Sequence, residues 1–117
     1  MKQGPFVVVT ALRSEHAAIA STLPPDTVVE RCGMGPAKVR QWLPRLMELT
    51  PGVVAVAGVA GGLDPSLRAG DIVVATEVRD ERGRALLRGA APLVAELRRL
   101  GLRVHTGPIV STDHIVG

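Results

Sequence analysis

Residues 53–77, VVAVAGVAGGLDPSLRAGDIVVATE, contain two short apolar runs separated by a glycine-rich segment. The runs Val53–Ala57 and Ile72–Ala75 are rich in β-branched residues, which is typical of strands buried on both faces of a sheet. Between them lies GVAGG at 58–62, where missing side chains allow a sharp turn or a close approach of the backbone. Open α/β sheets bind ligands at loops of this kind. A tight turn without a ligand explains the same glycines, so both interpretations stay open.

The length and composition bound the class of protein. The chain has 117 residues, of which 46% are hydrophobic, enough for one domain with a real core. A net charge of +3 with only 2% aromatic residues argues against nucleic-acid binding, which needs clustered basic charge and usually stacking aromatics. The single cysteine fits a reducing compartment, and no apolar run is long enough to span a membrane. We expect a cytoplasmic protein that binds no nucleic acid and has no membrane span.

Apolar patterns along the chain predict alternating strands and helices. A proline at position 44 predicts a kink or an early break in the second helix, and the polar segment 80–89 is expected to be a mobile loop. The alternation predicts a three-layer α/β/α fold with a mostly parallel central sheet. The expected strands are Phe6–Thr10, Thr27–Cys32, Val53–Ala57, Ile72–Val78 and Arg103–Val110, and the expected helices are Arg13–Leu23, Pro36–Glu48 and Ala91–Leu100.

Glu15 is the first candidate for chemistry. It follows the first expected strand by a few residues, at the start of a helix. A carboxylate there can lie at the same sheet edge as the segment 58–62, within reach of a bound ligand. An acid in the first turn of a helix is also stabilised by the helix dipole without any catalytic role. From position alone this second interpretation is the simpler one.

The other polar candidates are weaker. The segment GMG at 33–35 begins like a dinucleotide fingerprint, but Lys38 stands where the third glycine belongs, so we discount a dinucleotide-binding Rossmann fold. The amides at the start of the following helix could still face an anion or a sugar. Cys32 has no base that the sequence places beside it, and a structural thiol explains it better than a nucleophile.

The three histidines and Asp71 favour structural roles, with one exception. His16, His105 and His114 lack the spacing of metal ligands, so no metal site is predicted. His105 lies on an expected strand and is interpreted as structural. His114 follows a strand in a loop, which makes it the best site candidate of the three. Asp71, just before a strand, is expected to accept backbone hydrogen bonds.

Four segments carry a resemblance to a known family. They are ALRSE at 11–15, CGMGPAK at 32–38, GVAGGL at 58–63 followed by LRAGDIV at 67–73, and PIVSTD at 108–113. The same segments occur in this order in the nucleoside phosphorylase/nucleosidase superfamily, which the chain resembles over nearly its whole length. The resemblance is closest to the methylthioadenosine/S-adenosylhomocysteine nucleosidase branch.

The resemblance implies cleavage of the N-glycosidic bond of a purine nucleoside, with adenine as the expected base and 5′-methylthioadenosine or S-adenosylhomocysteine as examples. It implies no redox cofactor and no metal. Glu15 takes the position of the carboxylate that orients the attacking water, where a negative charge also stabilises an oxocarbenium-like transition state. The substrate-binding residues that the resemblance implies are Ala11, Leu12 and Met34 at the 5′ substituent, Val59, Ala60 and Gly61 at the sugar and base, and Ile115 and Val116 at the purine.

One departure from the nucleosidase pattern leaves a second reaction open. Nucleosidases usually carry a hydroxyl residue where this chain has Val59, and in this respect the chain is similar to hopanoid-associated phosphorylases, which act on an adenosyl lipid. Phosphorolysis would need phosphate as a second substrate. Arg13 and Arg68 could bind phosphate, but neither matches the phosphate-binding pattern of the phosphorylases, so hydrolysis is favoured.

A second departure concerns the extent of the chain. The family segments that grip the ribose hydroxyls and protonate the purine do not occur here, so residues 1–117 are expected to form the N-terminal half of the domain. A non-catalytic fragment that binds a nucleoside or a partner is therefore a further alternative. Because the family is usually oligomeric, the resemblance also implies a homo-oligomer.

Overall fold

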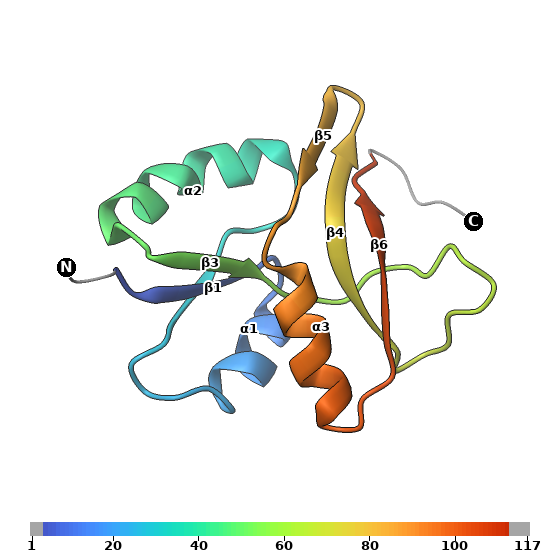
Figure 1. Ribbon diagram of the computed structural model, residues 1–117. Helices are drawn as coiled ribbons and strands as arrows, with labels where there is room; N and C mark the ends of the chain where they lie inside the picture. Colours follow the sequence, from blue (N-terminus) through green and yellow to red (C-terminus); the bar gives the residue numbers. More distant parts are fainter. Residues whose placement is uncertain (1–3, 113–117) are drawn as a thin grey trace. The chain divides into compact units, whose positions relative to one another are not determined.

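The computed structural model describes residues 4–112, which contain six strands and three helices (Figure 1). The predicted alternation of strands and helices is confirmed. The chain divides into two compact units, residues 1–60 and 61–117. The elements in order are β1 (Phe6–Thr10), α1 (Arg13–Ala20), β2 (Val28–Arg31), α2 (Pro36–Leu49), β3 (Val53–Val56), β4 (Ile72–Asp80), β5 (Gly83–Leu86), α3 (Ala90–Arg99) and β6 (Val104–Val110).

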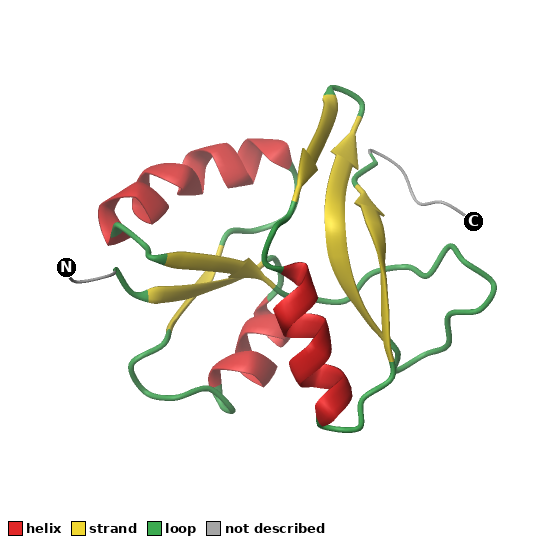
Figure 2. Ribbon diagram, in the orientation of Figure 1, coloured by secondary structure: helices red, strands yellow, loops and turns green. Residues whose placement is uncertain are grey.

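The first unit is built around β1. The sheet has the order β2-β1-β3 with all strands parallel, and Val8 of β1 is paired with Val29 and Ala55. The central strand is the core of this unit, because Val7 to Thr10 are all buried and Val7 has no exposed surface. Helices α1 and α2 lie on opposite sides of the sheet (Figure 2). The apolar run of β1 therefore predicted a strand covered on both faces correctly.

Helix α1 ends three residues before the expected end at Leu23. The hydroxyls of Ser21 and Thr22 donate to the carbonyl oxygens of Ala18 and Ile19, at 3.1 and 2.9 Å. Such side-chain bonds compete with a further helical turn. The residues after Ala20 therefore form a turn.

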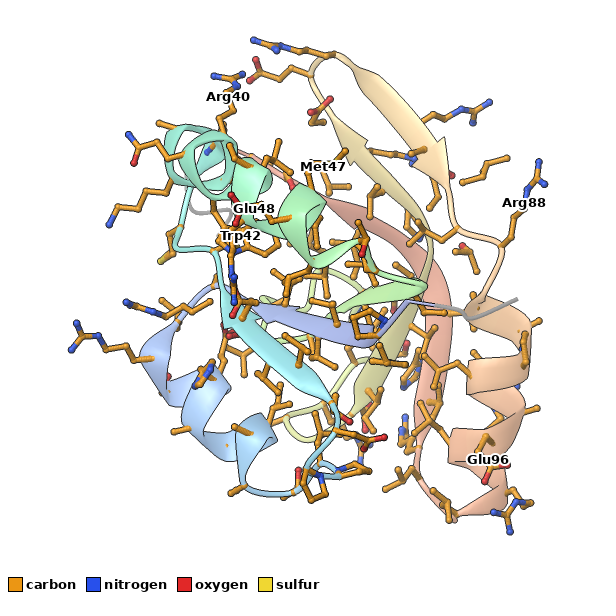
Figure 3. All side chains as sticks on the ribbon, turned by 90° about the vertical axis from the view of Figure 1, so that its left-hand side faces the viewer. Arg40, Trp42, Met47, Glu48, Arg88 and Glu96 are labelled. Atoms are coloured by element: carbon orange, nitrogen blue, oxygen red, sulfur yellow. The ribbon has the colours of Figure 1, made fainter. Side chains whose placement is uncertain are left out.

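Helix α2 continues through Pro44 to Leu49, so the expected early break at the proline is wrong. Pro44 is exposed, so the carbonyl left without an amide partner can bond to water instead. Along α2, Trp42 is half-buried, whereas Met47 is exposed (Figure 3). None of the helices in residues 4–112 is long and apolar enough to cross a membrane.

The second unit contains a sheet with the order β5-β4-β6. Strands β4 and β6 are parallel, and β5 is antiparallel to β4, so the pairing in the two sheets is mostly parallel as predicted. A register shift between Ala75 and Glu77 interrupts the β4–β6 pairing, and Glu77 is buried beyond it. The core consists of Val74, Ala90, Val94 and Val104, with Ile72 and Leu97 packed against them.

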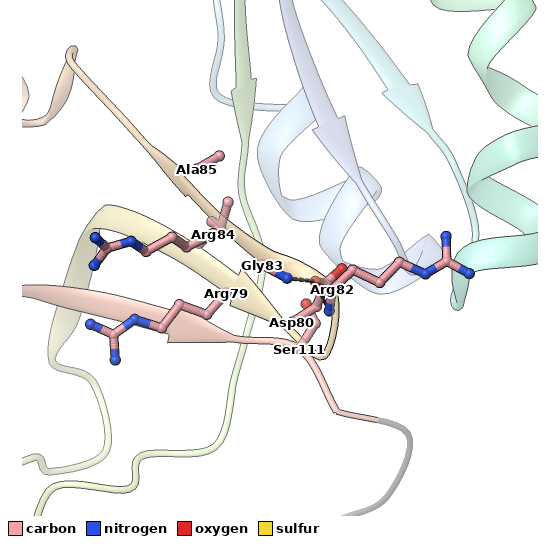
Figure 4. A pocket seen from close by; sticks show the side chains of 8 residues that line it. Arg79, Asp80, Arg82, Gly83, Arg84, Ala85 and Ser111 are labelled. Atoms are coloured by element: carbon pink, nitrogen blue, oxygen red, sulfur yellow. Dashed lines mark hydrogen bonds between the residues drawn. The ribbon is translucent and has the colours of Figure 1, made fainter.

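The expectation of a mobile loop at 80–89 is wrong, because β5 pairs with β4 across a tight turn. The Asp80 carboxylate accepts the amides of Arg82 and Gly83 at 2.8 and 3.1 Å, which closes the turn (Figure 4). Gly83 has φ 154°, a value that residues with a side chain rarely adopt. Residues 83–86 lack β-branched and aromatic side chains, so propensity gave no strand signal there. Pairing with the longer β4 supplies the strand.

Candidate active site

The carboxyl edge of the sheet β2-β1-β3 brings three loops together. Since all three strands are parallel, the segments that follow Thr10, Arg31 and Val56 leave the sheet at the same edge. Backbone pairing continues one residue past the strands: the amide of Cys32 donates to Thr10 at 2.8 Å, and that of Ala57 donates to Val9 at 2.9 Å. This is the edge at which open α/β sheets bind ligands.

Glu15 connects two of these loops through its carboxylate. It is the third residue of α1, and Leu12, the N-cap residue that precedes the helix, is extended. Its Oε1 accepts the amides of Ala11 and Leu12 at 3.2 and 3.0 Å, as an acid at this helical position commonly does. Its Oε2 accepts the amide of Val59 at 2.8 Å. One side chain therefore ties the loop after β1 to the loop after β3.

The electrostatics at Glu15 favour the ionised carboxylate. The pKa of Glu15 is lowered, chiefly by the Val59 amide and further by the amides of Leu12 and Ala11, while burial opposes the shift. Among the described residues, no Lys, Arg or His forms an ion pair with Glu15. The site therefore presents a negative charge that backbone dipoles hold and that no described cationic side chain neutralises.

The other predicted site residues of the first unit lie in the same three loops. Ala11 and Leu12 are half-buried and contact Glu15 through their amides. Met34 lies in the loop after β2 and Val59 in the loop after β3, where their side chains are 65% and 82% exposed. Ala60 follows Val59 and is also exposed. Apolar side chains thus stand in solvent at the edge where the carboxylate lies.

Three predicted residues fall elsewhere. Gly61 belongs to the second unit. Ile115 and Val116 lie outside the described residues, as does His114. The substrate-binding roles of all these residues stay predictions.

Gly58 also belongs to this site, although the sequence marked it only as the first residue of the glycine-rich segment 58–62. A Cβ atom built on it would lie 2.5 Å from Oε2 of Glu15 and 2.9 Å from its Cδ. The signal in the sequence was the position of Gly58, directly after the apolar run of β3. The acid that approaches it comes from a segment 43 positions earlier, which no local pattern shows.

Cys32 and His16 have structural surroundings. The Cys32 thiol is half-buried and donates to the carbonyl of Gly33 at 3.3 Å. The His16 Nε2 lies 3.3 Å from the carbonyl oxygen of Val29 on β2. Residues 4–112 contain no group of three or more His, Cys, Asp or Glu side chains placed to hold a metal ion.

A second carboxylate cluster lies in the second unit, where β4 and β6 begin. Oδ2 of Asp71 accepts the Arg68 amide at 3.0 Å, as expected from the sequence, and Arg103 Nε and His105 Nε2 lie 3.1 and 3.0 Å from it. The Arg68 amide lowers the pKa of Asp71 most, and His105 and Arg103 lower it further. His105 therefore packs in a structural ion cluster. The sequence signal for this cluster was the spacing of Arg103 and His105, because residues two positions apart in a strand lie on the same face.

A hollow of about 390 Å³ lies beside the β4–β5 hairpin, and Figure 4 shows the side chains that line it. Small-molecule sites are mostly apolar and concave. This hollow is instead lined by exposed residues of the β4–β5 hairpin, among them Arg79, Arg82, Arg84 and Asp80, and by the exposed Ser111 after β6. The arginines Arg79 and Arg84 are also paired with the buried Glu77. We therefore do not assign a substrate site to this hollow.

Comparisons with known proteins agree with this architecture. A family model described as the phosphorylase superfamily matches residues 7–117. A crystal structure of a mutant MTAN from Helicobacter pylori, with 5′-methylthioadenosine in its active site, is similar with a TM-score of 0.85 and 15% sequence identity. The similarity covers 98% of this chain and 67% of the MTAN chain, and at this identity it shows a common fold. No curated protein matches the chain significantly. Because the family model spans almost the entire sequence, the chain belongs to the phosphorylase superfamily.

Proposed function

We propose that this protein cleaves the N-glycosidic bond of a purine nucleoside, with an adenine nucleoside such as 5′-methylthioadenosine as substrate and water as the attacking group. The observation that carries the proposal is the Glu15 carboxylate at the carboxyl edge of a parallel sheet, held by three backbone amides. Cleavage of a glycosidic bond develops positive charge on the sugar, and a fixed, unneutralised anion stabilises that charge.

The geometry of Glu15 suits the binding of a water molecule. A carboxylate offers about four acceptor positions, two on each oxygen. Among the described residues, two donors occupy Oε1 and one occupies Oε2. The remaining position on Oε2 can accept a hydrogen bond from the attacking water and orient it. Because the pKa of Glu15 is lowered, the carboxylate is a weak base, and it acts mainly by charge and orientation.

The exposed apolar side chains at the same edge support a substrate with an apolar 5′ substituent. Met34 and Val59 both present apolar surface there. The MTAN structure of the same fold carries 5′-methylthioadenosine in its active site. An adenosyl lipid, as in the hopanoid-associated phosphorylases, has an apolar 5′ group too and is the alternative substrate class.

Adenine release from 5′-methylthioadenosine by the full-length natural protein tests the proposal. The assay is run with and without phosphate, and we expect equal rates in both. Strict dependence on phosphate would replace hydrolysis by phosphorolysis, for which Arg13 on the first turn of α1 and Arg68, both exposed, are candidate cations. Release from no adenine nucleoside would remove the proposal and leave a non-catalytic binding role.

We also propose that residues 1–117 form the N-terminal part of the catalytic domain, about two thirds of it and not half when compared with the MTAN chain. The support is the extent of the structural similarity, which covers 98% of this chain and 67% of the MTAN chain. Adenine release by residues 1–117 alone is compared with release by the full-length natural protein, and we expect activity only in the latter. Cytoplasmic location and homo-oligomer formation stay predictions, to be tested by fractionation and by sedimentation.

A further inference from the structure

We infer that Gly58 is a positioning residue for Glu15: the absence of a side chain at position 58 lets the carboxylate reach the Val59 amide and thereby sets the orientation of its free acceptor position. The inference deepens the proposed function and rests on it. Gly58 acts only through Glu15 and does not itself contact a reacting atom.

The Glu15 carboxylate is held from two separate directions. The amides of Ala11 and Leu12 hold Oε1 from within the same helix start, so these contacts form from local structure alone. The Val59 amide reaches Oε2 from a loop 44 positions later in the chain. The two local donors fix the position of Oε1, and the Val59 amide fixes Oε2 as well, so that both oxygens of the carboxylate are held.

Gly58 makes the third contact possible. A Cβ atom on residue 58 would lie 2.5 Å from Oε2, 2.9 Å from Cδ and 3.1 Å from Oε1 of Glu15. Real Cβ atoms essentially never lie within 3.0 Å of another heavy atom in this way, so either the carboxylate or the loop would have to move. The glycine is not needed for its own backbone angles, because Gly58 is absent from the glycines with positive φ. Glycine is therefore needed at position 58 because the Glu15 carboxylate lies so close to its backbone.

A displaced carboxylate would lose both of its functions in the proposed reaction. It would turn the free acceptor position of Oε2 away from the water, and it would move the negative charge relative to the sugar. Misplacement of a catalytic group by about 1 Å can cost on the order of a hundredfold in rate. We expect Gly58→Ala to lower kcat by about a hundredfold and to change KM less, since the side chains of Val59 and Ala60 in the same loop are kept.

Four proteins test the inference: the full-length natural protein and its Gly58→Ala, Glu15→Ala and Glu15→Ala/Gly58→Ala variants. The truncation of Glu15 removes the atoms that a Cβ at position 58 would meet. Gly58→Ala should therefore lower kcat in the natural background and have no further effect in the Glu15→Ala background. Gly89→Ala is the matched control, because a Cβ there meets nothing within 4 Å and Gly89 has φ −81°. It should leave kcat unchanged.

A second readout does not depend on activity. The pKa of the Glu15 carboxyl, followed by carbon-13 NMR, should rise from its lowered value toward the ordinary glutamate value in Gly58→Ala, because the Val59 amide no longer donates to it. An unchanged pKa would overturn the inference. An equal loss of kcat in both backgrounds would overturn it as well.

The two readouts separate this inference from the proposed function. If the natural protein cleaves no nucleoside, the proposed function fails, and the pKa of Glu15 still decides whether Gly58 positions the carboxylate. If Gly58→Ala does not fold, the double variant should regain folding because the clash is absent. Failure of the double variant to fold would show that residue 58 meets something other than Glu15, and the inference would be wrong.

Discussion

Glu15 and Asp71 are two carboxylates with lowered pKa values in two different environments. Glu15 lies at the carboxyl edge of β1 and accepts backbone amides only. Asp71 lies at the beginning of β4 and has a cationic partner, Arg103, and a hydrogen-bonding partner, His105, besides one backbone amide. Both side chains are fixed in place, but only the charge of Asp71 is neutralised by its neighbours.

This difference separates a carboxylate suited to chemistry from one suited to stability. Backbone amides orient an anion and hold it ionised without cancelling its net charge, so its field remains available to a substrate. Cationic side chains cancel that field and bind segments together instead. Arg103 illustrates this, since its guanidinium also contacts the carbonyl oxygen of Ser66 at 3.4 Å and so joins the start of β6 to the segment before β4. A lowered pKa alone would not have distinguished the two acids.

The largest expected effect is the loss of activity on changing Glu15. Glu15→Gln keeps the shape of the side chain and removes its charge, so kcat in adenine release should fall by about a hundred- to thousandfold, the usual cost of losing one preorganised electrostatic contact. Asp71→Asn is the matched change in the other unit and should leave kcat close to that of the natural protein. If Glu15→Gln keeps the turnover of the natural protein, Glu15 only caps the helix, and the contrast between a catalytic Glu15 and a structural Asp71 is wrong.

The pH dependence of activity is the next expected effect. Because the pKa of Glu15 lies below its ordinary value of about 4.3, the carboxylate should be fully ionised above about pH 5. The ratio of kcat/KM between the natural protein and Glu15→Gln should therefore be constant above about pH 5 and decline below it as Glu15 takes up a proton. A ratio that changes through neutral pH would indicate that Glu15 has a raised pKa and acts as a proton acceptor.

Asp71 should affect stability where it does not affect turnover. Its pKa is lowered in the folded protein, so its contribution is complete above the unfolded pKa, about 3.9, and is lost as the pH falls through the folded pKa. We expect Asp71→Asn to melt several degrees below the natural protein at neutral pH, with the difference shrinking as the pH falls. Thermal unfolding followed by circular dichroism at several pH values measures this. A difference that is independent of pH would contradict the ion-cluster interpretation.

The smallest expected effect comes from His105. Arg103 and the Arg68 amide still hold Asp71 when His105 is removed, so His105→Gln should lower the melting temperature less than Asp71→Asn does. Glutamine retains a donor that can reach the carboxylate. If His105→Gln destabilises the protein as much as Asp71→Asn, the histidine and not the arginine is the main partner of Asp71.

The positions of most strands and helices could be predicted because their signals are local. The β-branched run of β1 and the glycine and prolines around α2 mark their elements without reference to the rest of the chain. The prediction failed at β5, where residues 83–86 have weak strand propensity and form a strand only because β4 offers a pairing edge. It also failed at the end of α1, where Ser21 and Thr22 bond to the helix carbonyls instead of extending it.

The sequence by itself determined most of the elements, their mostly parallel arrangement and the place of Glu15 at the start of the helix that follows β1. These depend on periodicity, on short-range capping and on the rule that parallel strands bring their following loops to one edge. Only the tertiary structure decided that the Glu15 carboxylate bonds to Val59, that it occupies the space a Cβ of residue 58 would take, and that Arg103 and His105 both contact Asp71. Each of these contacts joins residues more than thirty positions apart, where pairing of the strands and not local preference sets the distance between them.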